Sequence, residues 1–279
     1  MTATILVGVS PDSPAAQRAV DWAATRATSH QQAIRLLAVV DGTEGAVGAA
    51  AVITDAAAAM QEELDSEVER LREQGLEATA HVEHGSPVAR LTEASAAAAL
   101  LVIGSDYKVN GETARGVHGT RIAAAAHCPV VVVPEAEPSS RAGVVVGVDG
   151  TETSAMAVAF AAAEADRQSE PLMAVTVWTP LALPRRMRSY PPHYLESLEE
   201  MAEESLSLSL AGLAQHYPDL RVQRRVERGH PAAVISRYGT SAVLTVVGSH
   251  GRGTVTRFLL GSVSEEVLRR PPGVTAVVR

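Results

Sequence analysis

The chain has 279 residues, 46% of them hydrophobic and 3% aromatic, so one large or two ordinary domains can bury cores built mainly from Ala, Val and Leu. The formal net charge is −8, without a long basic block, which disfavours nucleic-acid binding because phosphate contacts need a clustered basic surface. The single cysteine, Cys128, excludes an intramolecular disulfide, and neither a signal peptide nor a membrane-spanning apolar segment is recognisable, so we predict a cytoplasmic protein.

Strand and helix signals alternate along the first half of the chain. The apolar run Thr4–Val9 predicts a strand, and Ser13-Pro14 is typical of a helix start, because serine caps the helix and proline suits its first turn. We predict further strands at Ile34–Val40, Ala78–Val82, Leu100–Ile103 and Val130–Val133, and further helices at Ile53–Gln74, Pro87–Ala99 and Thr120–Ala126.

The second half shows the same alternation. We predict strands at Val144–Val148, Leu172–Val177, Arg221–Val226, Ala242–Val247 and Val274–Val278, and helices at Ser154–Arg167, Tyr194–His216, Ala232–Tyr238 and Ser262–Arg270. Short apolar strands without polar alternation indicate a sheet covered on both faces, and the intervening helices indicate a parallel, doubly wound α/β fold. In such sheets ligands bind beyond the carboxyl ends of the strands, where the strand order reverses.

Short motifs recur between the two halves at a nearly constant distance. Val7-Gly8-Val9-Ser10 matches Val146-Gly147-Val148-Asp149 at an offset of 139 residues, and Gly119-Thr120 matches Gly261-Ser262 at 142. A repeat this long indicates a domain duplication, since solenoid units run about 20–50 residues. A polar, proline-containing linker separates the copies, so we predict domains at 1–135 and 142–279.

A glycine-rich segment follows the predicted strand Ala242–Val247. Gly248 and Gly251 are followed, after nine residues, by Gly261-Ser262, where a helical pattern begins. Glycine lets backbone N–H groups approach an anion closely, and a helix N-terminus supplies free donors and a partial positive charge. Structural alternatives stay open, because Ser262 and Glu265 have capping-box spacing and Asp149 can cap the turn after its strand.

This Gly248-x-x-Gly251 pattern with its following Gly261-Ser262 resembles the ATP-binding motif of the universal stress proteins. The resemblance extends over both halves, as in the tandem members of actinobacteria. It implies two five-stranded parallel sheets, each with strand order 3-2-1-4-5 and helices on both faces, related by a pseudo-two-fold axis. It also implies that ATP lies between the loops after the first and fourth strands of a half.

The same resemblance implies roles for individual residues. Asp149 would hold the ribose or the adenine edge, and the backbone around Val177 would meet the adenine. The ribose and phosphates would be surrounded by Gly248, Gly251, Gly261 and Ser262. A Mg²⁺ ion is expected to accompany the triphosphate, with no ligand identified. The placement of Arg252 near the phosphates is our own inference from its position in the loop.

The first half departs from the pattern. Ser10 stands where the second half has Asp149, and Tyr107 stands where it has Gly251. The counterparts that remain as candidate nucleotide contacts are Val39, Gly104, Gly119 and Thr120. A tyrosine at a tight loop position predicts hindered phosphate approach, so whether this half binds ATP is left open.

We therefore predict an ATP-binding regulatory protein of the stress or dormancy response with little or no ATP turnover. The chain has no Gly-x-x-x-x-Gly-Lys-Ser/Thr loop and no obvious base to activate a water. An adenylating or ATP-pyrophosphatase-like enzyme stays an alternative, because Val7–Ser13 weakly resembles the Ser-Gly-Gly-x-Asp-Ser loop of that class. A nucleotide-free interaction module, with the glycine loop as a tight connection, is another.

The last predicted strand of each half is short and apolar. A flat apolar edge invites pairing with another edge, so Val130–Val133 and Val274–Val278 predict a homodimer or an intramolecular pairing of the halves. Regulatory protein partners are expected but not identified, and neither nucleic acid nor membrane is expected as a partner.

Overall fold

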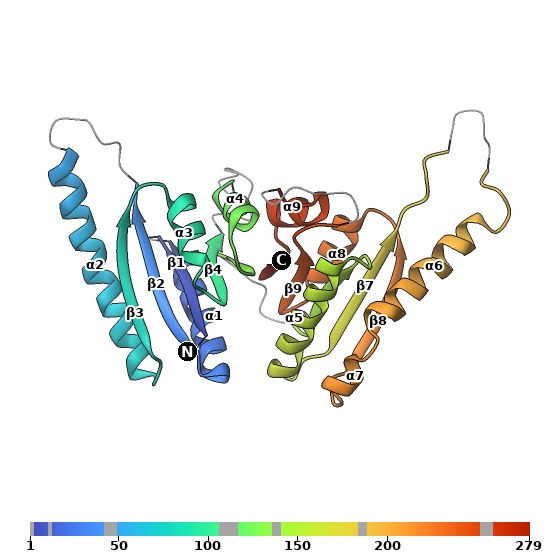
Figure 1. Ribbon diagram of the computed structural model, residues 1–279, viewed down its shortest axis with the longest axis horizontal. Helices are drawn as coiled ribbons and strands as arrows, with labels where there is room; N and C mark the ends of the chain where they lie inside the picture. The colour runs from blue at the N-terminus through green and yellow to red at the C-terminus, as the bar shows by residue number, and fades with distance from the viewer. Residues whose placement is uncertain are drawn as a thin grey trace. The chain divides into compact units, whose positions relative to one another are not determined.

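The computed structural model describes residues 3–10, 13–41, 49–105, 117–135, 141–183, 189–251 and 259–279. The chain divides into two compact units, Met1–Glu137 and Pro138–Arg279, called unit 1 and unit 2 below (Figure 1). None of the helices in these ranges is long and apolar enough to cross a membrane.

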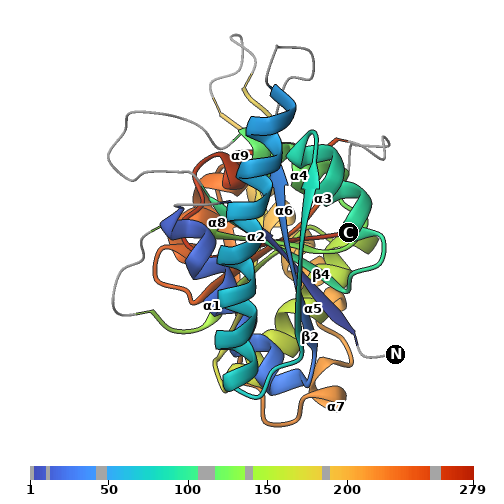
Figure 2. The same cartoon turned by 90° about the vertical axis from the view of Figure 1, so that its left-hand side faces the viewer.

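Unit 1 is a parallel sheet with helices on both faces. Its strands are β1 (Thr4–Val9), β2 (Ala33–Val40), β3 (Ala78–His84), β4 (Leu100–Ser105) and β5 (Val130–Pro134), in the order β3-β2-β1-β4-β5. Its helices are α1 (Pro14–His30), α2 (Ala49–Glu73), α3 (Pro87–Ser95) and α4 (Val117–Ala125). Helices α1 and α2 pack on one face and α3 and α4 on the other, as Figure 2 shows from the side of this unit.

Local signals position these elements as expected. Ser13 is the N-cap of α1, its Oγ accepts a hydrogen bond from the Ala16 N–H at 3.3 Å, and Pro14 occupies the first turn. The buried face of α1 is almost entirely alanine, which lets the helix lie close to β1 and β4. Val, Leu and Ile from the strands complete the core, in keeping with the low aromatic content.

Unit 2 repeats this architecture. Its strands are β6 (Val144–Val148), β7 (Leu172–Trp178), β8 (Val222–Arg228), β9 (Leu244–Gly248) and β10 (Thr275–Val278), in the order β8-β7-β6-β9-β10. Its helices are α5 (Glu152–Gln168), α6 (Tyr194–Ser209), α7 (Leu213–His216), α8 (Pro231–Gly239) and α9 (Ser262–Arg269). Both units therefore have strand order 3-2-1-4-5 with every described pair parallel, which confirms the predicted fold class.

Two predicted helices have different bounds. The single helix expected at Tyr194–His216 is wrong, because α6 ends at Ser209 and Gly212, with φ of 79°, separates it from α7. In unit 1, α4 begins at Val117 rather than Thr120, so Gly119 and Thr120 lie inside its first turn.

A hydrogen bond joins β8 to α8 at the edge of unit 2. The Tyr238 hydroxyl donates to Glu227 Oε1 at 2.5 Å, and Arg237 lies 3.3 Å from Glu227 Oε2. The Tyr238 hydrogen bond, helped by Arg237, holds the pKa of Glu227 below its ordinary 4.5, and the Glu227 carboxylate raises the pKa of Tyr238 above its ordinary 10.0.

Replacing Tyr238 by phenylalanine should therefore give a pH-dependent loss of stability. Because the folded pKa of Glu227 is lowered, the stabilisation is present above pH 4.5 and is lost as pH falls through the folded value. At neutral pH we expect a loss of about 1 kcal/mol, since the pair is partly exposed. Thermal unfolding of both proteins from pH 3 to 7 measures this, and an equal difference at pH 3 and pH 7 would contradict it.

Candidate functional site

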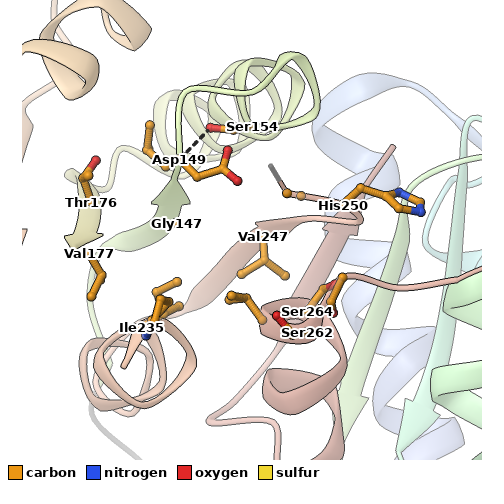
Figure 3. A pocket seen from close by; sticks show the side chains of 16 residues that line it. Gly147, Asp149, Ser154, Thr176, Val177, Ile235, Val247, His250, Ser262 and Ser264 are labelled. Carbon is orange, nitrogen blue, oxygen red and sulfur yellow. Dashed lines mark hydrogen bonds between the residues drawn. The ribbon is translucent and has the colours of Figure 1, made fainter. Parts of the chain in front are cut away.

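A cavity of about 510 Å³ lies at the carboxyl ends of β6, β7 and β9 in unit 2, on the face covered by α8 and α9 (Figure 3). It occurs where the sheet order reverses, since β6 pairs with β7 on one side and β9 on the other. The six described residues predicted for this half all line it, namely Asp149, Val177, Gly248, Gly251, Gly261 and Ser262. The seventh, Arg252, lies outside the described residues.

Asp149 holds a turn through its hydrogen bonds and also presents its carboxylate to the cavity. Its Oδ1 accepts hydrogen bonds from the N–H and the hydroxyl of Thr151, at 3.0 and 2.6 Å, and thus holds the turn before α5. Thr151, rather than Asp149, is the N-cap of α5. The carboxylate points from the end of β6 toward the cavity (Figure 3), and Oδ2 lies beside Gly251. The turn-holding alternative and a ligand-facing role are therefore compatible.

The glycine loop is closed at its stem by backbone hydrogen bonds. The Gly261 N–H donates to the Ser249 carbonyl oxygen at 2.7 Å, and the Ser249 N–H donates to the Val278 carbonyl oxygen at 2.7 Å. The first bond brings the two ends of the loop together, and the second ties the stem to β10. Gly251 and Gly261 consequently lie side by side, with the Gly251 nitrogen 3.4 Å from where a Cβ on Gly261 would stand.

The N-terminus of α9 reaches the cavity without a side-chain cap. Gly261 is the N-cap, so the structural alternative of a capping box between Ser262 and Glu265 does not hold: Ser262 is already the first helical residue. Glu265 instead accepts a hydrogen bond from Arg269 at 2.9 Å, which offsets its charge. The first-turn residues Ser262 and Val263 line the cavity, and the N–H groups of a first turn have no intrahelical acceptor. This arrangement suits an anion.

The Ser264 side chain contacts both ends of the glycine loop. Its buried hydroxyl lies 3.1 Å from the Ser249 oxygen and 3.0 Å from the Gly261 oxygen, so a single proton is shared between them. The sequence gives no signal for Ser264, because nothing in its spacing distinguishes it from any other serine in a helix.

Replacing Ser264 by alanine should loosen the loop without unfolding unit 2. Both oxygens keep a backbone donor, the N–H of Gly261 and of Glu265, so neither is left unsatisfied. We expect a loss of about 1 kcal/mol in the free energy of unfolding. Urea unfolding measures it; Ser262→Ala, at an exposed first-turn position, is the matched control. A loss no larger than that of the control would show that the buried bond is not stabilising.

Other residues complete the walls of the cavity. Pro231 and Ile235 enter from α8, and His250 from the glycine loop. His250 is half-buried, with Nδ1 2.9 Å from Ser249 Oγ. The recurrence of proline in His84-Gly-Ser-Pro87 and Arg228-Gly-His-Pro231 was the available signal for Pro231, whereas nothing in the sequence distinguished Ile235.

Unit 1 arranges its candidate residues differently. Gly104, at β4, packs against α1, since a Cβ there would lie 2.6 to 2.8 Å from backbone atoms of Ala15 and Ala16. Gly119 and Thr120 lie within α4, instead of ahead of it as Gly261 lies ahead of α9. Val39 lies near the end of β2. A described cavity of about 320 Å³ in this unit lies between α1 and α2 and is lined by none of these four. Tyr107 lies outside the described residues.

Fold and site together define a duplicated, doubly wound α/β protein whose second copy carries a glycine-lined cavity at its switch point. The sequence model of the universal stress protein family matches residues 1–134 and 143–279. A universal stress protein of Mycolicibacterium smegmatis is 33% identical over 290 residues, covering 99% of this chain and 96% of its own. One of Mycobacterium tuberculosis is 34% identical over 304 residues, covering 99% and 94%. The chain belongs to the universal stress protein family.

Solved structures agree with the fold. A putative universal stress protein from Pseudomonas aeruginosa aligns with a TM-score of 0.71 at 18% identity, over 99% of this chain and 93% of its own. A universal stress protein from Archaeoglobus fulgidus aligns with a TM-score of 0.70 at 18% identity, over 99% and 96%. At this identity the likeness concerns the fold alone.

Proposed function

We propose that this protein binds ATP in unit 2 and acts as a regulatory protein of the stress or dormancy response, with little or no ATP turnover. The observation that carries the proposal is the 510 Å³ cavity, where Asp149, Gly248, Gly251, Gly261 and the start of α9 meet. Its volume lies within the range of small-molecule and cofactor sites. Family membership supports the regulatory role.

The proposed contacts follow from the chemistry of each wall. The Asp149 carboxylate accepts hydrogen bonds from ribose hydroxyls or from the adenine amino group, while Thr151 keeps it oriented. The β7 backbone at Val177 borders the adenine. Glycine backbone at the loop stem and the first-turn N–H groups of α9 receive the phosphates, and the Ser262 hydroxyl adds one donor.

The walls also suit a triphosphate that arrives with Mg²⁺. Asp149 is the only carboxylate among the described lining residues, so protein ligands for a metal are few. Mg²⁺ commonly keeps several waters and binds through one or two carboxylates together with substrate phosphates. Held in this way, the ion would neutralise phosphate charge.

Slow turnover is part of the proposal. The described titratable side chains that line the cavity are Asp149 and His250, and both are engaged in local bonds, with Thr151 and Ser249 respectively. No lysine lines the described part of the cavity to draw charge from a γ-phosphate. A turnover assay that detects rapid phosphate release, or AMP and pyrophosphate release with an acceptor, would favour the enzyme alternative instead.

Mass spectrometry of ligand released from denatured, freshly purified protein is the direct test. We expect ATP, with a stoichiometry of one per chain if unit 1 is empty and two if it also binds. Equilibrium binding of ATP, ADP, AMP and cyclic AMP then ranks the nucleotides. Absence of binding by all four would leave the nucleotide-free interaction module as the function.

Assembly is a separate proposal. We propose that the terminal strands β5 and β10 mediate pairing, either within one chain or between two chains. Sedimentation velocity with and without ATP distinguishes these arrangements, because only pairing between chains gives a concentration-dependent dimer.

A further inference from the structure

Strand β8 forms the outer edge of unit 2 and leaves half of its backbone groups facing outward. The Leu172 N–H donates to the Arg221 oxygen at 2.9 Å, and the Gly229 N–H donates to the Trp178 oxygen at 3.0 Å. The backbone N–H and C=O groups of the odd-numbered residues of β8 are therefore hydrogen-bonded to β7. Because backbone direction alternates along a strand, the N–H and C=O groups of Val222, Arg224, Val226 and Arg228 point away from the sheet. No strand in the described part of the chain follows β8 on that side within unit 2.

The same outward-facing residues share one face of the sheet. Glu227 bonds to Tyr238 of α8, so the odd-numbered side chains lie on the α8 face. The even-numbered side chains lie on the opposite face. Arg224 and Arg228 are exposed there, with Val226 half-buried between them. Arg228 stacks over the Trp178 ring at 5.8 Å, and within the described ranges neither arginine makes an ion pair.

The equivalent edge of unit 1 is capped by arginine side chains at both ends. The outward-facing carbonyl oxygens at the two ends of β3 accept hydrogen bonds from arginines: Ala78 from Arg72 at 2.9 Å and His84 from Arg90 at 3.0 Å. In the repeat, Val234 replaces Arg90. On β8, Arg225 contacts the Arg224 oxygen, but no described side chain donates to the oxygens of Val222, Val226 or Arg228. The duplication therefore offers one edge capped at both ends and one basic edge whose end carbonyls accept no hydrogen bond from a described side chain.

We propose that the outer edge of β8 binds an extended acidic segment of a partner protein, which adds to unit 2 as a sixth strand. Backbone hydrogen bonds would provide the affinity, as in other cases of strand addition. The segment residues opposite Arg224, Val226 and Arg228 would set the sequence preference of the edge. They would be acidic opposite each arginine and apolar opposite Val226. The segment therefore reads acidic-x-apolar-x-acidic in either strand direction.

Charge selects this occupant over two others. A second copy of β8 would bring its arginines against these in an edge-to-edge pair, and like charges directly opposed are destabilising. A nucleic acid would need a larger clustered basic surface than this edge offers, on a chain with a net charge of −8 and no long basic block. An acidic strand can bond to the backbone edge while its carboxylates stay beside Arg224 and Arg228.

Fluorescence anisotropy with the full chain tests the proposal. The probe is a labelled peptide, Thr-Thr-Glu-Thr-Val-Thr-Glu-Thr, and the matched peptide has lysine in place of both glutamates. We expect the glutamate peptide to bind at least about tenfold more tightly than the lysine peptide. The double substitution Arg224→Glu and Arg228→Glu should reverse this preference. Equal binding of the two peptides by the native protein would overturn the proposal.

A backbone variant separates strand addition from simple charge attraction. Val226→Pro removes an N–H that points outward and leaves the β7 ladder intact, whereas the matched control Val226→Thr keeps that N–H. We expect the proline variant to lose peptide binding and the threonine variant to retain it. Circular dichroism checks folding, and if the proline variant does not fold, the charge reversal alone decides.

Two further measurements assign the edge to other occupants if the proposal is wrong. Tighter binding of a labelled single-stranded DNA than of the peptide, weakened by the same charge reversal, would identify a nucleic-acid surface. A dimer in sedimentation velocity that Val226→Pro abolishes would identify a second copy as the occupant. Either result would overturn the acidic-strand proposal, and both are independent of whether unit 2 binds ATP.

Discussion

Replacing Gly251 by alanine is expected to weaken ATP binding to unit 2 by about tenfold or more, which corresponds to ~1.4 kcal/mol. An added Cβ would stand 2.8 Å from Asp149 Oδ2, so the carboxylate must move from its present position. The Thr151 bonds to Oδ1 resist that movement. Gly251 lacks a left-handed φ, so the effect is a steric one on the cavity rather than backbone strain.

Isothermal titration calorimetry with ATP measures the affinity of this variant. Gly212→Ala is the matched control, because its φ of 79° makes alanine unfavourable while no atom lies within 4 Å of the new Cβ. We expect the control to lose stability and to keep its affinity for ATP. Gly251→Ala should keep its stability and lose affinity for ATP. If the two variants bind ATP equally well, Gly251 does not border the nucleotide.

Replacing Gly104 by alanine is expected to destabilise unit 1 by about 2 kcal/mol or more. The new Cβ would lie 2.6 Å from the Ala15 carbonyl carbon and 2.7 Å from the Ala16 nitrogen. Both are backbone atoms at the start of α1, which cannot turn aside as a side chain can, so the helix itself must shift. Gly104 then acts as a packing residue, whatever unit 1 binds.

Differential scanning calorimetry measures this loss as a fall in the melting temperature of about 4 to 8 °C. Gly119→Ala provides the comparison, because its Cβ would meet only Ile103 Cδ1 at an ordinary 3.7 Å, and alanine favours a helix. An unchanged melting temperature for Gly104→Ala would contradict close packing of β4 on α1. ATP binding by unit 2 should be unaffected in both variants.

The two glycines illustrate why a repeated motif does not imply a repeated site. Gly104 and Gly248 occupy equivalent positions at the carboxyl end of the fourth strand of each unit, yet a Cβ on Gly248 would meet the Thr153 side chain at 3.1 Å and backbone atoms no closer than 3.4 Å. Gly104 instead faces the backbone of α1. The glycine of unit 1 is explained by helix packing alone, so its presence is no evidence for a nucleotide there. Stoichiometry remains the measurement that decides.

Local sequence signals determined much of this protein. Apolar runs, the Ser13-Pro14 helix start and the recurrence of Val-Gly-Val were sufficient for the α/β class, the duplication and the strand order through the family resemblance. They also placed Asp149 and the glycines at strand ends that prove to share one cavity. Such features are readable because each depends on a few neighbouring residues and on backbone conformations that glycine, proline and β-branched residues favour.

Only the tertiary structure decided which partners the site residues have. The closure of the glycine loop brings Ser264 to Ser249, and helix packing places Ile235 in the cavity wall. It also makes Gly261 the N-cap of α9, where spacing had suggested a capping box with Ser262, and caps the end carbonyls of β3 but not those of β8. These outcomes depend on the path of the backbone and on how helices and strands pack, and a sequence pattern of local period carries little information about either.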